Sequence, residues 1–232
     1  MIFRSIIFYL LLGVWTIFLG IIFIPFLFSN KKNIRISAKI WISGIFKLLK
    51  FTCNITYEIR GKSNIPNYPC LIASKHQSAF ETFALYYFID NSIFIHKKQL
   101  FNIPIFGQYL KKANMISIER SEKISAIRQM IKETSKKISQ GFSIIIFPEG
   151  TRKKQDDPPD YKSGIVGIYK ETKAKVLPVA VNSGYCWPKH TFIKREGKII
   201  ISFLKIINSE LENREILERI KQAIEEETKK IR

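Results

Sequence analysis

The sequence predicts an α/β protein, in which a sheet with helices on its faces follows an apolar N-terminal segment. Two observations lead to this fold class. After residue 50, short apolar runs of strand length alternate with stretches of helical periodicity, which is the pattern of strands interleaved with helices. Before residue 30, an uncharged apolar run is long enough to cross a bilayer. Because 232 residues suffice for one domain of ordinary size, we expect a membrane-anchoring helical segment over 1–50 and a single domain over 51–232.

The apolar run is the first expected element. Residues 5–30 contain no charged side chain, and no small-residue cleavage site follows them, which distinguishes the run from a secretory signal peptide. One basic residue, Arg4, precedes the run, whereas four basic residues follow it between positions 31 and 39. By the positive-inside rule, this asymmetry places the rest of the chain on the cytoplasmic side of the inner membrane.

The second expected element is a basic amphipathic helix over 36–51. Arg35, Lys39, Lys47 and Lys50 recur at helical spacing among apolar residues, a pattern typical of a helix in the lipid headgroup layer. No acid precedes Glu58, so this part of the chain can bind anionic membrane lipid without repulsion. Two alternatives stay open: a core helix of the domain, and a hairpin of both helices that dips into one leaflet.

The domain begins where the periodicity changes to two, which predicts a strand with one buried face. Apolar runs and helical patterns then alternate to the end of the chain, where a docking helix is expected from residue 209. A charged, proline-containing stretch over 153–161 is typical of a surface loop. The expected strands are 51–60, 70–73, 93–95, 115–118, 142–147, 176–181 and 199–206, and the expected helices within the domain are 79–89 and 124–138.

The charge of the chain limits the classes of partner that it can bind, and its cysteine content bears on its compartment and on metal sites. Lysine and arginine outnumber acids 38 to 19, and the formal net charge of +19 favours nucleic acid, acidic lipid, a phosphorylated substrate or an acidic carrier protein. The three cysteines are scattered, as expected in a reducing compartment. Neither they nor the three histidines have the spacing of a metal site, so no metal is expected.

Standard catalytic motifs are absent. The chain has no G-x-S-x-G, no P-loop and no G-x-G-x-x-G, which argues against a serine hydrolase, a P-loop NTPase and a dinucleotide enzyme.

A histidine and a carboxylate stand where the predicted strand 70–73 gives way to a helix, and ligands of open α/β sheets gather at that edge. Glu81 can orient His76 as a general base. Since residues five apart on a helix point in different directions, the pairing requires His76 to lie in the turn before the helix. The alternatives are a chance spacing and a capping box, because Ser78 and Glu81 also have the spacing of a helix cap.

A second candidate is the stretch FPEGTR, residues 147–152, directly after another predicted strand. Gly150 lets backbone N–H groups approach an anion, while Thr151 and Arg152 supply a hydroxyl and a guanidinium suited to phosphate. The alternative is a strand-ending turn with a surface arginine. Arg120 ends the strand 115–118, and alone such an arginine is most often simply solvated.

Taken together, these stretches resemble a known family. The order KHQSAFE (75–81), IPIFGQYLKKANMISIER (103–120), FPEGTR (147–152) and LPVAV (177–181) is similar to the four blocks of the glycerolipid acyltransferase family, which includes 1-acylglycerol-3-phosphate acyltransferases. The resemblance spans about residues 70–185. It implies a mixed, mostly parallel sheet flanked by helices, with a membrane-associated N-terminal helical region.

The resemblance also implies roles for individual residues. His76 matches the catalytic base of the family, and Glu81 matches its acidic partner, for which the family usually has aspartate. The matching substrate-binding positions are Arg120, which would bind phosphate, Glu149 and Gly150, which would bind the acceptor, and Thr151 and Arg152, which complete that block.

The implied reaction moves a fatty acyl group from acyl-CoA or acyl carrier protein to the 2-hydroxyl of lysophosphatidate, giving phosphatidate, and needs no cofactor. Another lysolipid acceptor, such as a lyso-ornithine lipid or a lysophospholipid, is the first alternative. A membrane-tethered nucleic-acid-binding protein is an alternative of a different class. Because the positive charge is spread along the chain and no nucleic-acid module is present, we expect no nucleic-acid partner.

Overall fold

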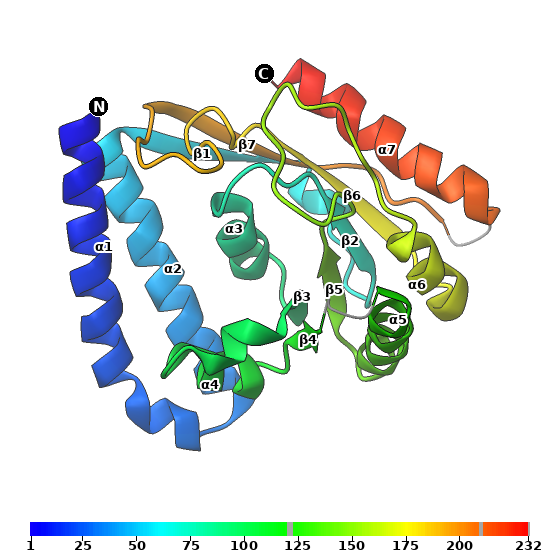
Figure 1. The fold of residues 1–232 in the computed structure, drawn as a ribbon, viewed down its shortest axis with the longest axis horizontal. Coiled ribbons are helices and arrows are strands. Elements are labelled where there is room, and N and C mark those ends of the chain that lie inside the picture. The colour runs from blue at the N-terminus through cyan, green and yellow to red at the C-terminus, as the bar shows by residue number, and fades with distance from the viewer. Residues whose placement is uncertain (120–122, 209–210, 232) are drawn as a thin grey trace.

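A pair of antiparallel helices stands along one side of an α/β domain (Figure 1). The structure, a computed structural model, describes residues 1–119, 123–208 and 211–231. The pair consists of α1 (Ile2–Ile22) and α2 (Lys31–Cys53), which are joined by the short 3-10 helix η1 (Ile24–Phe28). The expected N-terminal two-helix segment is therefore confirmed.

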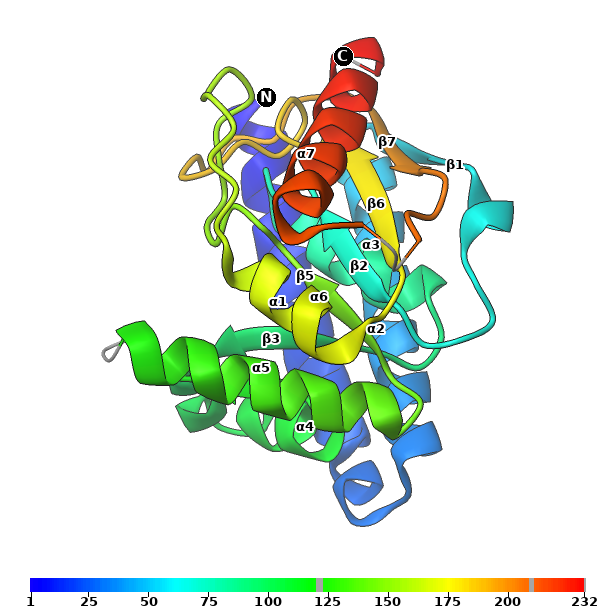
Figure 2. The same ribbon diagram turned by 90° about the vertical axis from the view of Figure 1, so that its right-hand side faces the viewer.

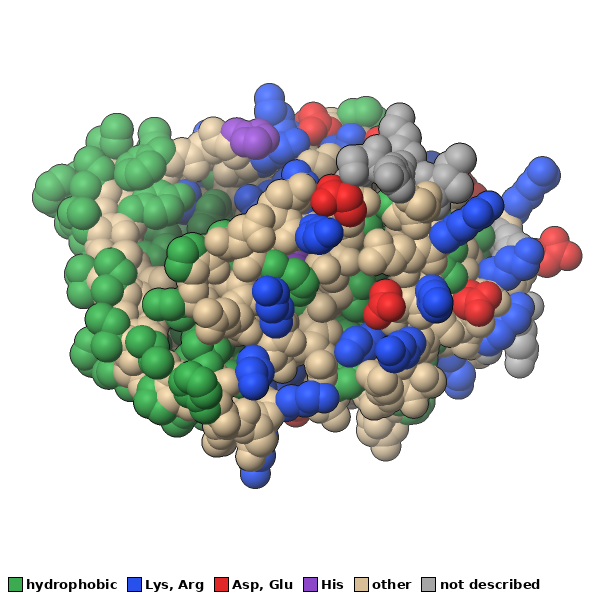
Figure 3. Space-filling model, turned by 60° about the horizontal axis from the view of Figure 1, so that its bottom comes forward, with side chains coloured by type: hydrophobic (Ala, Val, Ile, Leu, Met, Phe, Trp, Pro, Cys, Tyr) green, Lys and Arg blue, Asp and Glu red, His purple; other side chains and the backbone are tan. Residues whose placement is uncertain are grey.

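Much of α1 is left uncovered by the rest of the molecule. Within the described residues, it is the one helix that is long and apolar enough to cross a membrane, and only 17% of its apolar window is buried. Its uncovered side chains form a continuous apolar region, seen at the left of Figure 3. We name this region the apolar α1 face; it consists of Ile2, Phe3, Ile6, Leu10, Leu11, Val14, Ile17, Phe18, Ile21 and Ile22.

The other side of α1 packs closely against α2. The Trp15 indole donates a hydrogen bond to the Trp41 carbonyl (3.0 Å), and the Trp41 indole donates to the Thr16 hydroxyl (3.0 Å). At Gly44 of α2 the approach is closest, because an added Cβ would lie 2.2 Å from Nε1 of Trp15. A residue without a side chain is therefore required at this crossing point.

Helix α2 belongs to the core of the domain. Ile42, Ile45 and Leu49 are buried among side chains of the sheet and of α3. The Arg35 guanidinium donates to the backbone carbonyls of Tyr86 and Ile89, at the end of α3. The alternative of a core helix is thus supported, and the expectation that the apolar face of α2 lies in the headgroup layer is wrong, since the domain covers that face.

Helix α2 also extends further than the pattern predicts. It continues to Cys53, where Asn54 ends it in the left-handed conformation (φ 54°). The strand expected over 51–60 therefore begins only at Ile55. Apolar residues at 51 and 53 continue the alternation of the strand, which is why periodicity alone misplaces this boundary.

The domain is built on a seven-stranded sheet with the order β1-β7-β6-β2-β5-β3-β4. Every neighbouring pair is parallel except β6 and β7, which are antiparallel. The mixed, mostly parallel sheet is thus confirmed, and each expected strand is present. The strands are β1 (Ile55–Arg60), β2 (Leu71–Ser74), β3 (Ser92–Lys97), β4 (Ile116–Ile118), β5 (Ser143–Ile146), β6 (Val176–Val181) and β7 (Gly197–Phe203).

Helices cover both faces of the sheet, as Figure 2 shows with α5, α6 and α7 in front of the strands and α1, α2 and α3 behind them. Alternate residues of a strand face the two layers: Ile72 of β2 packs with α2 and α3, and its neighbour Leu71 packs with α6 and α7. The domain helices are α3 (Phe80–Phe88), α4 (Phe106–Lys112), α5 (Lys123–Ser139), α6 (Gly164–Thr172) and α7 (Asn213–Lys230), with 3-10 helices η2 (Lys62–Asn64) and η3 (Lys98–Asn102).

The strands β6, β2 and β5 are adjacent and parallel, so their carboxyl ends meet at one edge of the sheet. The segments that follow them begin at residues 75, 147 and 182. Two of these segments contain the candidate motifs, which the topology therefore places side by side.

Candidate active site

The loops after β2, β5 and β6 are joined to one another by hydrogen bonds. The Lys153 amide donates to the His76 carbonyl (2.8 Å), which links the loop after β5 to the loop after β2. The Gly184 amide, after β6, donates to the side-chain oxygen of Gln77 (3.0 Å). The KHQSAFE block (75–81) and the FPEGTR block (147–152) thus form one structural unit with the residues that follow LPVAV (177–181).

His76 and Glu81 form the expected pair. Nδ1 of His76 lies 2.9 Å from Oε1 of Glu81. His76 lies in the turn before α3 and Glu81 in the first turn of that helix, as the five-residue spacing requires. The backbone amides of Gln77 and Ser78 also donate to Oε1 of Glu81 (2.7 Å each), so the same carboxylate caps the helix.

The carboxylate of Glu81 is fully buried and ionised. Its second oxygen accepts hydrogen bonds from the hydroxyls of Ser78 and Ser183 (2.6 Å each). Burial acts to raise the pKa of Glu81, but the hydrogen bonds from His76, Ser183 and Ser78 outweigh it and hold that pKa below its ordinary value. Because an ionised carboxylate only accepts, Nδ1 of His76 is the donor, which leaves Nε2 as the basic nitrogen.

The imidazole of His76 is fixed in its plane by an aromatic ring. It stacks on Phe147, the first residue of the FPEGTR stretch, with ring centroids 3.8 Å apart and an interplanar angle of 15°. Its side chain is 13% exposed, so the ring reaches solvent. This arrangement leaves an imidazole that is held on two sides and open on a third.

Glu149 is enclosed beneath the same turn. It is 1% exposed, and its two oxygens accept from the Nζ of Lys75 (2.9 Å) and from the backbone amide of His76 (3.2 Å). Burial raises the pKa of Glu149. The resemblance implies that this carboxylate contacts the acceptor directly. The geometry favours a positioning role instead, because both oxygens of Glu149 are already bound within the protein.

The remaining substrate-binding candidates lie at the surface of the same loop. Gly150 adopts a positive φ of 67°, a conformation that favours glycine. Thr151 and Arg152 are exposed next to Lys153, whose amide binds His76. Arg120 lies outside the described residues.

Several residues at this site were not predicted from the sequence. Ser183 follows the fourth resembling block at the carboxyl end of β6, and its place at the sheet edge was the available signal. Lys75 directly precedes His76 in the chain, but nothing in the sequence distinguishes it from an ordinary surface lysine. Glu225, which pairs with Lys75 from α7, has no distinguishing signal, because α7 carries several other glutamates.

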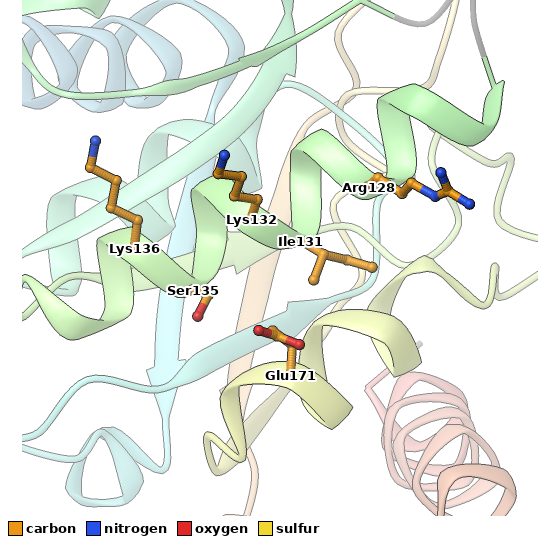
Figure 4. Close-up of a pocket in the computed structure, with 6 residues that line it drawn as sticks. All are labelled: Arg128, Ile131, Lys132, Ser135, Lys136 and Glu171. Atoms are coloured by element: carbon orange, nitrogen blue, oxygen red, sulfur yellow. The ribbon is translucent and has the colours of Figure 1, made fainter.

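A shallow hollow between α5 and α6 is separate from these loops (Figure 4). Ile131 and Ser135 point from α5 toward Glu171 of α6, and basic side chains extend along the rest of α5 (Figure 4). The hollow contains no residue of the candidate site. Its lining consists of Arg128, Ile131, Lys132, Ser135, Lys136 and Glu171.

Comparison with known proteins gives consistent matches. The family model described as Acyltransferase matches residues 56–182. A 1-acyl-sn-glycerol-3-phosphate acyltransferase of Pseudomonas aeruginosa is 32% identical over 224 residues, which cover 96% of this chain and 87% of that protein. The chloroplastic 1-acyl-sn-glycerol-3-phosphate acyltransferase BAT2 of Brassica napus is 30% identical over 188 residues, 77% of this chain and 53% of that protein.

A solved structure has the same fold. The crystal structure of the 1-acyl-sn-glycerophosphate (LPA) acyltransferase PlsC from Thermotoga maritima superposes with a TM-score of 0.82, and the match covers 99% of this chain and 96% of that one. The sequences are 20% identical, so this match concerns the architecture.

Proposed function

Because the chain belongs to the Acyltransferase family, we propose that it transfers a fatty acyl group from an acyl thioester to the sn-2 hydroxyl of 1-acylglycerol-3-phosphate, giving phosphatidate. The observation that carries the proposal is the hydrogen bond between His76 and the buried, ionised Glu81. The Pseudomonas relative, which matches over nearly the whole chain, supports lysophosphatidate as the acceptor. The donor is acyl-CoA or acyl carrier protein.

The reaction follows from the orientation of the imidazole. Nε2 of His76 takes the proton of the acceptor hydroxyl as the oxygen attacks the thioester carbonyl, and Glu81 stabilises the imidazolium that forms. When the tetrahedral intermediate collapses, the C–S bond breaks and the thiolate receives the proton from His76. The new ester and a free thiol leave, so no acyl-enzyme is required.

The acceptor phosphate lies, in this proposal, against Thr151, Arg152 and Arg120. The two side chains that the structure describes are exposed on the loop that is hydrogen-bonded to His76. Gly150 allows backbone N–H groups to approach the acceptor, and Glu149 holds the loop from below. Arginine binds phosphate in a bidentate way, which would fix the reacting hydroxyl beside His76.

The protein acts, in this proposal, at the cytoplasmic face of the inner membrane with the apolar α1 face in one leaflet. Helix α1 is held to the domain near both ends: the Ser5 hydroxyl accepts from the Lys194 amide (2.8 Å), and the Phe23 carbonyl from the Tyr109 hydroxyl. A helix that crosses the bilayer would carry one of these ends away from the domain. The position of α1 therefore supports a half-inserted helix, beside which anionic lipids bind the basic surface.

One assay tests the activity and separates the two donors. Purified protein in detergent is given lysophosphatidate with either acyl-CoA or acyl carrier protein thioester, and phosphatidate is measured. Formation with at least one donor is expected, and competing lysolipids should not reduce it at equal concentration. Absence of phosphatidate with both donors would contradict the proposal.

A further inference from the structure

A buried lysine beside His76 has no part in the proposed chemistry. The side chain of Lys75 is 2% exposed, and its Nζ lies between two carboxylates, 2.9 Å from Glu149 and 2.7 Å from Glu225. An ammonium group in such a place needs charged partners, because desolvation of an unpaired ion is costly. Glu149 supplies one from the loop after β5, and Glu225 supplies the other from α7.

Glu225 belongs to α7, which is fixed on the sheet by Ile216, Ile220 and Ile224, each 0% exposed. Its position next to Ile224 in the chain sets the direction of its side chain. The oxygen of Glu225 that binds Lys75 also accepts a hydrogen bond from the hydroxyl of Tyr161 (2.9 Å). One carboxylate oxygen thus binds two separate loops of the candidate site.

One of these loops contains His76, the proposed base, and the other is hydrogen-bonded to the backbone of His76. Through Lys75 and Glu149, the carboxylate of Glu225 is connected to the backbone amide of His76. Tyr161 belongs to the segment after FPEGTR, whose ends bind the same region: Lys153 donates to the His76 carbonyl (2.8 Å) and the Lys162 amide to the Pro148 carbonyl (2.9 Å).

We propose that Glu225 is a positioning residue for acyl transfer. From its place on the C-terminal helix α7, it holds both the turn that contains His76 and the segment 153–163. Without this carboxylate, Lys75 keeps one carboxylate partner instead of two, and the Tyr161 hydroxyl loses its acceptor. The turn and the segment then gain freedom while the fold, which depends on the apolar side of α7, remains. The kinetic test of this inference rests on the proposed function.

The test compares Glu225→Ala, Glu225→Gln and Glu227→Ala. We expect Glu225→Ala to lower kcat by about 10- to 100-fold, since a small misplacement of a catalytic group has an effect of this size. Glu225→Gln keeps an oxygen that can accept from both Lys75 and Tyr161, and should restore kcat to within about threefold of the unchanged protein. The side chain of Glu227, on the same helix, binds only the Ser202 hydroxyl among the described contacts. Glu227→Ala therefore controls for loss of a side-chain hydrogen bond on α7 and should leave kcat unchanged.

Hydrogen exchange gives a second measurement that does not require activity. In Glu225→Ala, peptides that cover 75–79 and 153–163 should exchange faster, while peptides of β2 and β5 keep their protection. If the unchanged protein makes no phosphatidate but Glu225→Ala shows this local pattern, the proposed function fails, while the role of Glu225 in holding the turn and the segment stands. If the unchanged protein is active and Glu225→Ala stays within twofold of it, or Glu225→Gln does not restore kcat, the positioning role is overturned.

Discussion

At the scale of single residues, the site depends on one imidazole whose orientation is set by its neighbours. The chain has three histidines, and among them His76 has both a buried carboxylate on Nδ1 and an aromatic ring against its face. Sequence reasoning predicted the contact between His76 and Glu81 because the two residues are close in the chain and at a strand end. It missed Ser183, Lys75 and Glu225 because their importance comes from contacts across more than seventy residues.

Replacement of His76 by alanine should lower kcat by at least about 100-fold, because general-base catalysis contributes a factor of about 10² to 10⁴. The substitution removes a partly exposed ring, so the far-ultraviolet circular dichroism spectrum should not change. Phosphatidate formation is measured under saturating acceptor and donor. His190→Ala, at an exposed histidine, is the matched control and should keep full activity. Undiminished turnover in the His76 variant would refute the assignment of the base.

Removal of the Ser183 hydroxyl should raise the pKa of Glu81, because that hydroxyl is one of the donors that lower it. A carboxyl group with a depressed pKa contributes stability that is present above its ordinary pKa and is lost as the pH falls through the folded value. In Ser183→Ala this acid-induced loss should therefore be smaller and complete at a higher pH, and kcat should fall by about tenfold as the dyad loosens.

Acid unfolding curves and the pH profile of kcat check this prediction. Ser92→Ala is the control, since Ser92 is equally buried but donates to the Ile89 carbonyl away from the dyad. It should lower the free energy of unfolding by a similar amount at every pH and leave the pH profile of kcat in place. Identical pH midpoints for Ser183→Ala and the unchanged protein would argue against the role of Ser183.

At the scale of secondary-structure elements, hydrophobic periodicity located every strand of the sheet. Strands such as β6, all six residues of which are buried, appear in the sequence as uninterrupted apolar runs. The helices α4 and α6 were not predicted: the seven residues of α4 give too few turns for a clear helical pattern, and α6 contains two helix-weakening glycines among its nine residues. The role of α2 was misjudged for another reason: a basic amphipathic helix has the same pattern whether its apolar side meets lipid or a protein core.

The crossing of α1 and α2 gives a prediction at this scale. Gly44→Ala places a methyl group on the Trp15 indole, and overpacking of this kind costs about 1–3 kcal/mol. We expect the free energy of unfolding to fall by this amount and the tryptophan fluorescence to shift as Trp15 moves. Gly20→Ala in α1, where an added Cβ meets nothing within 4 Å, should leave stability unchanged or slightly raise it. Equal effects of the two substitutions would show that the crossing is not tightly packed.

At the scale of the whole molecule, apolar and charged surfaces are segregated. The apolar α1 face lies on one side, and basic side chains are spread over the domain beside it (Figure 3). The sequence predicted both surfaces, because each is a property of composition along a contiguous stretch. It left open whether α1 crosses the bilayer, since that depends on contacts of Ser5 and Phe23 with distant parts of the domain.

Conversion of Leu10, Val14 and Ile17 to glutamine should reduce binding to vesicles that contain anionic lipid by about tenfold or more, because it removes exposed apolar area from α1. Sedimentation with vesicles measures the bound fraction, and the activity of the variant in detergent should persist. Ile127→Gln, at an exposed isoleucine of α5, is the control and should bind as the unchanged protein does. If the triple variant binds equally well, α1 is not the membrane contact.

The loop between β6 and β7 contacts both the candidate active site and the apolar helix α1. At its start, Ser183 holds the carboxylate of Glu81, and near its end the amide of Lys194 binds α1 through Ser5. Phe192 stacks on Tyr9 of the same helix, with ring centroids 4.7 Å apart. A displacement of α1 away from the domain therefore also displaces this loop and, through Ser183, the hydrogen bonds around Glu81.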